Sequence, residues 1–114
     1  MSPSADREWL TVPDLVEMLG VTPGKVHRLI EDRILLGVRE DGVYRIPADF
    51  LRDGEPLHEL RGTVMVLLDA GFSDEEALSW LIEPSEDLGG TAPIDALRSG
   101  RKAEVRRVAQ SLAF

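Results

Sequence analysis

The sequence predicts a mainly α-helical fold that contains one small β-hairpin. Apolar residues recur at helical spacing along most of the 114-residue chain, and capping residues or glycines bound these stretches. Residues 35–47 differ, because they alternate around an Asp-Gly pair as a hairpin does. A hydrophobic content of 43% is enough for one core, so we expect one domain or one small module with an extension.

Two short helices are expected first, over residues 13–19 and 23–31. Gly20 supplies the left-handed residue that ends the first helix, and Thr22 caps the second, with Pro23 in its first turn. Apolar residues at helical spacing form the inward side of the two helices, and they are Val12, Leu15, Val16 and Leu19, then Val26, Leu29 and Ile30.

The second helix has a polar face that starts in its first turn. At about 100° per residue, Gly24 and Arg28 point away from the apolar stripe, and Lys25 and His27 flank it. A glycine on this face lets another backbone approach closely. Such a face is typical of a helix that reads a DNA groove.

The hairpin is expected over residues 36–46, with its turn at Glu40-Asp41-Gly42. Arg39 and Arg45 alternate with apolar and aromatic residues along its two strands. We expect one face to pack on the helices and the other to offer both guanidinium groups to phosphate. The acidic turn repels phosphate, so the strands rather than the tip should make the contact.

Helix, turn, helix and hairpin in this order predict a winged helix-turn-helix, in which one helix enters a DNA groove while the hairpin holds the backbone. The sequence therefore predicts binding of double-stranded DNA, with a recognition helix at about residues 23–31 and a wing at about 36–46. The candidate contacts to bases and phosphates are Thr22, Gly24, Lys25, His27, Arg28, Arg39, Tyr44 and Arg45.

Charge is unevenly distributed along the chain. The whole sequence carries −8, which repels nucleic acid at long range. Residues 22–45 hold five bases and four acids and so carry +1, whereas the remaining residues carry −9. A single copy is expected to bind DNA weakly and with strong salt dependence, and we therefore predict that two copies act as a homodimer.

Beyond the hairpin, the sequence predicts a helical extension. Residues 47–51 are expected to form a short closing helix, 52–56 a loop, and Ser73-Asp74-Glu75-Glu76 a capping box. Further helices are expected over residues 60–70, from 74 to about 81, over 93–98 and over 101–112. The predicted organisation is a flexible tail (1–8), a winged helix-turn-helix (9–53) and a C-terminal helical domain packed on it (54–114).

Two parts of the chain resemble known families. Leu10-Thr11-Val12-Pro13 and Val43-Tyr44-Arg45-Ile46-Pro47 are similar to excisionase and MerR-type winged modules. Ala70-Gly71-Phe72-Ser73 and Thr91-Ala92-Pro93-Ile94-Asp95-Ala96-Leu97 resemble the Xre/MbcA/ParS antitoxin-type domain that binds toxins. Together, over Trp9 to Phe114, they resemble a family of small actinobacterial DNA-binding proteins with a winged helix-turn-helix and a helical C-terminal extension.

This resemblance implies a transcriptional regulator or a chromosome-associated factor without catalytic activity. Its antitoxin-like part implies the alternative, a module whose C-terminal helices bind a partner protein. The two alternatives predict different results, because the first binds DNA at low salt and the second retains one stoichiometric protein.

No cofactor, metal site or catalytic site is expected. His27 and His58 lie 31 positions apart, and neither has the neighbouring ligands that zinc requires. Motifs for an activated nucleophile or a glycine-rich phosphate loop are missing from the sequence. The longest apolar run, residues 64–68, is too short to span a membrane, and the N-terminus does not fit a signal peptide. A chain without cysteine suits the reducing cytoplasm, where we expect this protein.

Overall fold

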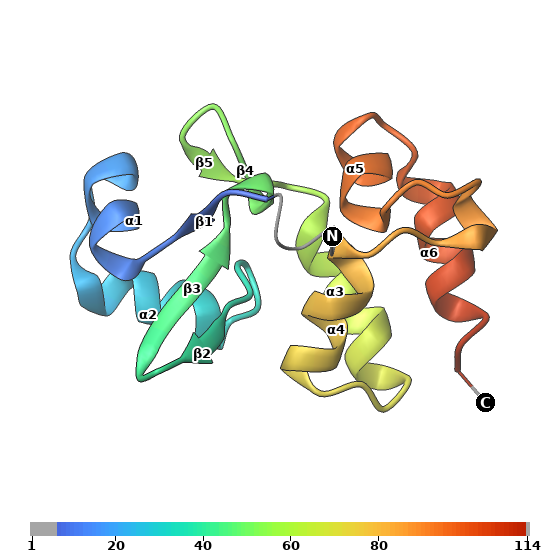
Figure 1. Ribbon diagram of the computed structural model, residues 1–114, viewed down its shortest axis with the longest axis horizontal. Helices are drawn as coiled ribbons and strands as arrows, with labels where there is room; N and C mark the ends of the chain where they lie inside the picture. Colours follow the sequence, from blue (N-terminus) through green and yellow to red (C-terminus); the bar gives the residue numbers. More distant parts are fainter. Residues whose placement is uncertain (1–6, 114) are drawn as a thin grey trace.

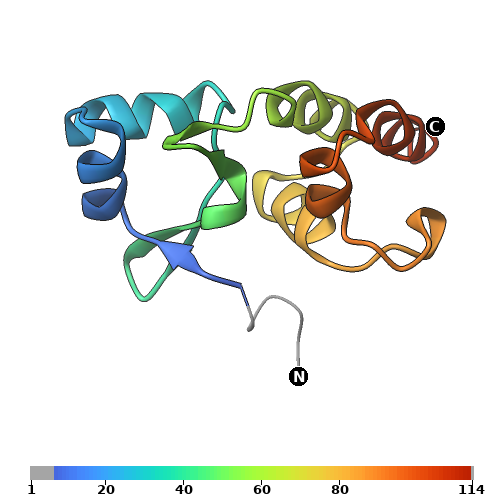
Figure 2. The same cartoon turned by 90° about the horizontal axis from the view of Figure 1, so that it is seen from above.

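The computed structural model describes residues 7–113, which form two halves that lie side by side (Figures 1 and 2). The N-terminal half holds helices α1 (Val12–Leu19) and α2 (Pro23–Glu31) and a three-stranded antiparallel sheet. The larger elements of the C-terminal half are all helices. Figure 2 shows α2, α3 (Leu60–Asp69) and α6 (Lys102–Gln110) along one side of the molecule.

Local hydrogen bonds set the ends of the first two helices. The Thr11 hydroxyl accepts from the Asp14 backbone N–H, and the Asp14 carboxylate accepts from the Thr11 N–H, which makes a capping box at the start of α1. Gly20 ends α1 at a φ of 67°. Thr22 caps α2 as predicted, and its hydroxyl accepts from the Lys25 N–H at 3.2 Å. The predicted turn between the two helices is therefore confirmed.

The end of α2 shortens the predicted first strand of the hairpin. Arg33 takes a left-handed φ of 60°, its N–H donates to the Ile30 carbonyl, and the N–H groups of Ile34 and Leu35 donate to the Leu29 carbonyl. Because these groups close the helix, they are not free for a strand ladder. The strand expected from Leu35 begins instead at Val38.

The sheet has the order β1-β3-β2, from strands β1 (Trp9–Leu10), β2 (Val38–Glu40) and β3 (Val43–Pro47). Strands β2 and β3 form the wing, and Asp41 and Gly42 turn between them at positive φ. Strand β1 was not predicted from the sequence. Its two residues pair with Pro47 and Ile46 of β3 and make that strand the centre of the sheet.

Another prediction about an irregular segment is wrong. Residues 52–56, expected to be a loop, belong to a small hairpin of β4 (Leu51–Arg52) and β5 (Glu55–Pro56), which follows the 3₁₀ turn η2 (Ala48–Phe50). The flexible tail over residues 1–8 stays a prediction, and at its end the Glu8 carbonyl accepts from the Ala48 N–H at 2.9 Å. Residues 1–6 lie outside the described part of the chain.

The C-terminal half contains α3 (Leu60–Asp69), α4 (Asp74–Ile82), α5 (Pro93–Arg98) and α6 (Lys102–Gln110), with a 3₁₀ turn η3 (Glu86–Leu88) before α5. The predicted capping box of α4 is confirmed by two hydrogen bonds, from Glu76 N to Ser73 Oγ (3.1 Å) and from Ser73 N to Glu76 Oε1 (2.9 Å). Within residues 7–113, none of the helices has the length and apolar character needed to cross a bilayer.

One hydrophobic cluster runs through both halves, so the two halves share a core. Leu15 and Val26 lie in it fully buried, as their helical spacing predicts. Fully buried members from the rest of the chain include Leu35, Ile46, Phe50, Leu60, Val64, Leu67, Leu81, Ile94, Leu97 and Val105. The position of α2 relative to the C-terminal half is thus fixed by packing rather than by a loose linker.

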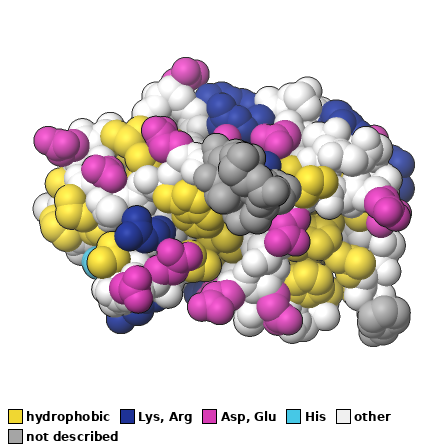
Figure 3. Space-filling model, viewed as in Figure 1, with side chains coloured by type: hydrophobic (Ala, Val, Ile, Leu, Met, Phe, Trp, Pro, Cys, Tyr) yellow, Lys and Arg dark blue, Asp and Glu magenta, His cyan; other side chains and the backbone are white. Residues whose placement is uncertain are grey.

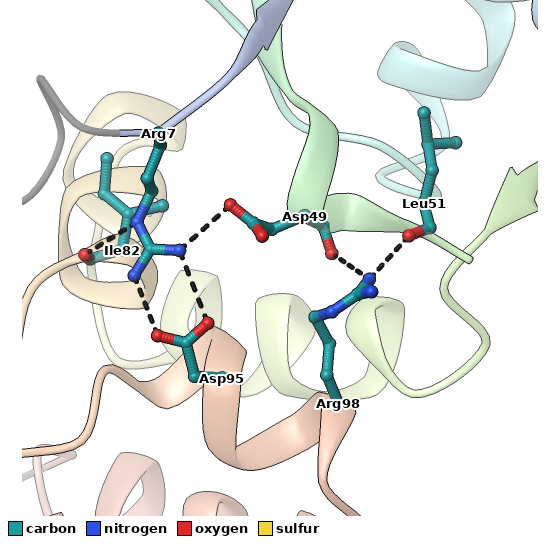
Figure 4. Close-up of polar contacts among 6 residues, drawn as sticks. All are labelled: Arg7, Asp49, Leu51, Ile82, Asp95 and Arg98. Carbon is teal, nitrogen blue, oxygen red and sulfur yellow. Dashed lines mark hydrogen bonds and ion pairs between the residues drawn. The ribbon is translucent and has the colours of Figure 1, made fainter.

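Polar contacts reinforce the junction of the halves (Figure 4). Arg7 donates to the Asp49 carboxylate of η2 at 2.9 Å, to the Asp95 carboxylate of α5 at 3.0 Å, and to the Ile82 carbonyl at the end of α4 at 3.2 Å. Beside it, Arg98 of α5 donates to the backbone carbonyls of Asp49 (2.9 Å) and Leu51 (2.5 Å). Residues from both ends of the chain therefore hold the winged module.

Candidate nucleic-acid interface

The outer side of α2 carries the polar residues that the sequence places there. Thr22, Gly24, Lys25, His27 and Arg28 are all exposed. Among the residues that the structure describes, neither Lys25 nor Arg28 forms an ion pair, so both charges are available to an external anion. Their exposure agrees with the predicted recognition face.

An aromatic contact connects this side of α2 to the wing. The rings of His27 and Tyr44 meet edge to face, with centroids 6.3 Å apart and planes at 82°. The Arg39 guanidinium carbon lies 5.3 Å from the centre of the Tyr44 ring, which is the geometry of a cation–π contact. Tyr44 thus holds a cation of the wing in a fixed relation to the helix.

Gly37 makes room for this arrangement. A Cβ at this position would lie 2.8 Å from Tyr44 Cδ1 and 3.1 Å from the backbone oxygen of Arg45. Real Cβ atoms do not approach a ring so closely, so the glycine allows the Tyr44 ring to rest directly on the chain before β2. The sequence analysis missed this role, since no local pattern brings Gly37 and Tyr44 together.

We define the α2–wing face as Thr22, Gly24, Lys25, His27, Arg28, Arg39 and Tyr44. Arg39 is exposed on this face and forms no ion pair within residues 7–113. The face therefore presents Lys25 and Arg28 on the helix and Arg39 on the wing, and the aromatic pair lies between the two elements.

Arg45 is placed differently from the other predicted contacts. Strand pairing sets Arg39 opposite Tyr44 and Val38 opposite Arg45, and paired residues share a face of the ladder while neighbours along a strand do not. The prediction that Arg39 and Arg45 lie on one face of the hairpin is therefore wrong. Arg45 shares its face with Glu40, and the two side chains form an ion pair at 3.7 Å between Nε and Oε2.

Helix α4 lies beside the edge strand β2. A hollow between them is lined by Trp9 and Val38 from the sheet and by Leu78 and Ile82 from α4, and Arg39 and Glu40 of β2 line it as well. The Arg45 side chain remains 41% exposed, so the C-terminal half does not cover it. Arg45 stays a predicted DNA contact, with a charge that Glu40 partly offsets.

Gly24 has no structural reason to be glycine. It lies within α2, and a Cβ built there meets only the Thr22 hydroxyl oxygen, at 3.9 Å. Glycine inside a helix costs about 0.5–1 kcal/mol relative to alanine. A residue that is unfavourable for the helix and is exposed among cations is consistent with close approach by another backbone.

Several other cations are already neutralised. Arg33 contacts Asp74 in the first turn of α4 through Nε and Nη2, each at 3.2 Å. On the face shown in Figure 3, Asp and Glu side chains are spread over both halves, while Lys and Arg gather in few places. Lys25, Arg28 and Arg39 keep their charges unpaired within residues 7–113, although the chain as a whole carries −8.

Metal-ligating side chains do not gather in the described part of the chain: no three His, Asp or Glu residues come together there as a metal site requires. His27 contacts Tyr44, and His58 lies in the other half, just before α3. Both histidines are exposed.

Two family models match the chain. One, described as "DNA-binding protein Rv2175c, wHTH domain", covers residues 3–51, and the other, "Rv2175c C-terminal domain of unknown function", covers residues 57–113. The DNA-binding protein Rv2175c of Mycobacterium tuberculosis is 31% identical over an alignment 121 positions long, which covers 96% of this chain and 83% of that protein. The chain belongs to the Rv2175c family.

The structural comparison agrees with this membership. The NMR structure of Rv2175c matches with a TM-score of 0.84 at 30% identity, over 96% of this chain and 83% of that one. An excisionase of Streptomyces ambofaciens is 44% identical over 46 residues, 40% of this chain and 74% of that protein. The predicted fold class and the predicted family of small winged proteins with a C-terminal extension are confirmed. The MerR-like and antitoxin-like parts of the resemblance stay predictions.

Proposed function

We propose that this protein binds double-stranded DNA as a transcriptional regulator or chromosome-associated factor, with α2 in the major groove and the wing on the neighbouring backbone. The observation that carries the proposal is the His27–Tyr44–Arg39 contact. It joins helix and wing into one surface on which Lys25, Arg28 and Arg39 remain free of ion pairs within residues 7–113.

Each cation has a role that follows from its position. Arg28 and Gly24 lie at the centre of the exposed side of α2, where base edges would be read. Lys25 on the flank and Arg39 on the wing lie where the two phosphate backbones of a groove would pass. We assign no catalytic role and no cofactor to this surface, because it holds side chains suited to binding rather than to bond making.

The test measures DNA affinity by fluorescence anisotropy for the Arg28→Gln and Arg39→Gln variants. Loss of a base contact at Arg28 should weaken binding by about 1–3 kcal/mol and relax preference at one base pair. Loss of a phosphate contact at Arg39 should weaken all sequences alike and reduce the salt slope by about one. The matched control is Arg107→Gln, which removes the same charge from an exposed position on α6.

Equal affinity in the two interface variants and in the control would rule out the α2–wing face as the binding surface. Arg45→Gln completes the set. Because Arg45 lies on the other face of the wing, we expect Arg45→Gln to reduce DNA affinity less than Arg39→Gln does, although both residues are on the wing.

Gly24→Ala separates function from stability. Alanine is the better helix former and has room for its Cβ, so the free energy of unfolding should rise by up to about 1 kcal/mol. DNA affinity should fall, because the methyl group would separate α2 from the groove. A variant that is more stable and binds DNA unchanged would show that close approach does not occur at this position.

A pool of genomic fragments distinguishes a regulator from a chromosome-associated factor. Enrichment of one fragment over random DNA indicates operator binding, whereas a steep salt slope without enrichment indicates nonspecific binding. Met18 and Val43 are the large apolar side chains exposed on the described surface, and they do not make a broad dimer face. We therefore expect two copies to meet on DNA and the free protein to be a monomer, which sedimentation with and without duplex tests.

A further inference from the structure

A cleft of about 640 Å³ lies where the two halves meet, beside α2 and on the opposite flank from the wing. Its walls come from the turn before α2, from α2 itself, from the β4–β5 hairpin and from the start of α3. Clefts of roughly 300–1,000 Å³ at domain junctions are typical sites for small molecules. We call it the junction cleft.

The floor of the junction cleft is apolar. Leu29 and Leu57 are almost fully buried beneath it, with exposed fractions of 8% and 2%. Six of the eleven lining residues are apolar, and they are Leu19, Val21, Leu29, Ile34, Pro56 and Leu57. A hydrated ion alone would leave this floor uncovered, so the fitting occupant has an apolar body.

The rim of the junction cleft is cationic. Lys25 and Arg61 line it together with the polar ring of His58, against the single acid Glu55. Lys25 and His58 are exposed and form no ion pair within the described residues. The excess of positive charge stands out on a chain with a net charge of −8, and it favours an occupant with an anionic group.

Arg61 is held ready for such a group. Its Nε donates to the Asp32 carbonyl at the end of α2 at 2.9 Å, which anchors the guanidinium at the cleft. No hydrogen bond from its two terminal nitrogens occurs within residues 7–113, so these nitrogens can both donate to one carboxylate or phosphate group. An anchored guanidinium loses less side-chain entropy on binding than a freely moving one.

We propose that the junction cleft binds a small organic anion whose apolar body covers the floor and whose carboxylate or phosphate group contacts Arg61 and Lys25. This proposal requires only the cleft. A second part rests on the proposed function: because Lys25 belongs to both the cleft and the α2–wing face, the bound anion competes with DNA phosphate for this side chain, and ligand and DNA weaken each other equally.

The first test uses 2-naphthoate as the ligand and no DNA. Titration into ¹⁵N-labelled protein should give saturable amide shifts around the junction cleft, with Kd near or below about 1 mM. The neutral analogue 2-naphthalenemethanol, which has the same rings, should bind at least about fivefold more weakly, since a charge-assisted pair contributes roughly 1 kcal/mol or more. No saturable shift at the cleft, or equal binding of acid and alcohol, overturns the proposal.

Variants assign the anionic group to its partners. Arg61→Gln should raise the Kd for 2-naphthoate at least about fivefold, and Arg107→Gln on α6 should leave it unchanged. Since Arg61 also bonds to Asp32, His58→Gln provides a second rim variant that leaves the end of α2 intact, and a smaller rise in Kd is expected for it. Equal effects of Arg61→Gln and Arg107→Gln would mean that charge acts only at long range, against the proposed contact.

The second test adds DNA. A concentration of 2-naphthoate a few times its Kd should reduce DNA affinity severalfold in the unmodified protein, and the same concentration should reduce it less in Arg61→Gln, which binds the ligand more weakly. If 2-naphthoate binds but DNA does not, the proposed function fails and the cleft proposal stands. If duplex DNA shifts the amides of His58 and Arg61 while 2-naphthoate shifts none, the rim contacts the DNA backbone and the small-molecule proposal is refuted.

Discussion

Replacing Arg7 with methionine should destabilise the whole protein, although the residue lies outside both the recognition helix and the wing. Its side chain is 12% exposed and contacts Asp49, Asp95 and the Ile82 carbonyl. Burial, the largest influence on the guanidinium, acts to lower its pKa. The hydrogen bonds and charges of Asp95 and Asp49 outweigh burial and raise the pKa, so Arg7 stays charged. Methionine keeps the apolar stem but loses all three polar contacts.

The magnitude follows from the exposure of each partner. The Asp49 side chain is 30% exposed, so losing this pair should cost about 1–2 kcal/mol. The Asp95 side chain is 48% exposed, and its pair contributes well under about 1 kcal/mol after solvent screening. The bond to the Ile82 carbonyl adds about 1 kcal/mol. We expect a total loss of about 2–4 kcal/mol and a fall in Tm of roughly 10 °C.

Urea unfolding monitored by tryptophan fluorescence measures this loss. Trp9 lies in β1 and Trp80 in α4, so Trp9→Phe and Trp80→Phe backgrounds report on the two halves separately. Because one core joins the halves, the two transitions should coincide, with and without Arg7.

Arg107→Met, at an exposed position on α6, is the matched control and should change the free energy of unfolding by less than about 0.5 kcal/mol. An equally small effect of Arg7→Met would refute the inference that the Arg7 contacts stabilise the junction. A double-mutant cycle with Asp95→Asn isolates the contribution of that pair and should give a coupling of at most about 0.5 kcal/mol.

Three further predictions concern the elements that position the interface. Gly37→Ala should cost about 1–3 kcal/mol in urea unfolding and shift the Tyr44 ring resonances, because the new Cβ overlaps the ring. Ser73→Ala should lower the free energy of unfolding by about 1 kcal/mol, because it removes the cap of α4. A loss as small as the one expected for Arg107→Met, less than about 0.5 kcal/mol, would show that the capping box contributes little. The backbone hydrogen bond from Ser73, followed by its side-chain hydrogen bond, lowers the pKa of Glu76 from its ordinary 4.5. The stability from Glu76 is therefore present above that value and lost as pH falls through the lowered pKa, so Glu76→Gln should flatten unfolding stability between about pH 5 and pH 2.

The sequence by itself determined the features that depend on near neighbours. The caps at Thr22 and Ser73 act across three residues, and the apolar stripes of the helices repeat within a few turns. These signals predict the helix starts, the wing turn and the polar face of α2 correctly, because each is complete within a short stretch of chain. The exposure of Lys25, His27 and Arg28 on α2 was predicted in this way, and their contacts with DNA stay a prediction.

Only the tertiary structure decided which distant residues meet. Strand register put Arg45 on the opposite side of the wing from Arg39 and beside Glu40, with which it forms an ion pair. Arg7 finds Asp49 and Asp95 at separations of 42 and 88 residues, and Arg61 reaches the end of α2 from α3. Such contacts leave no local pattern in the sequence, since their geometry arises when the shared core brings the two halves together.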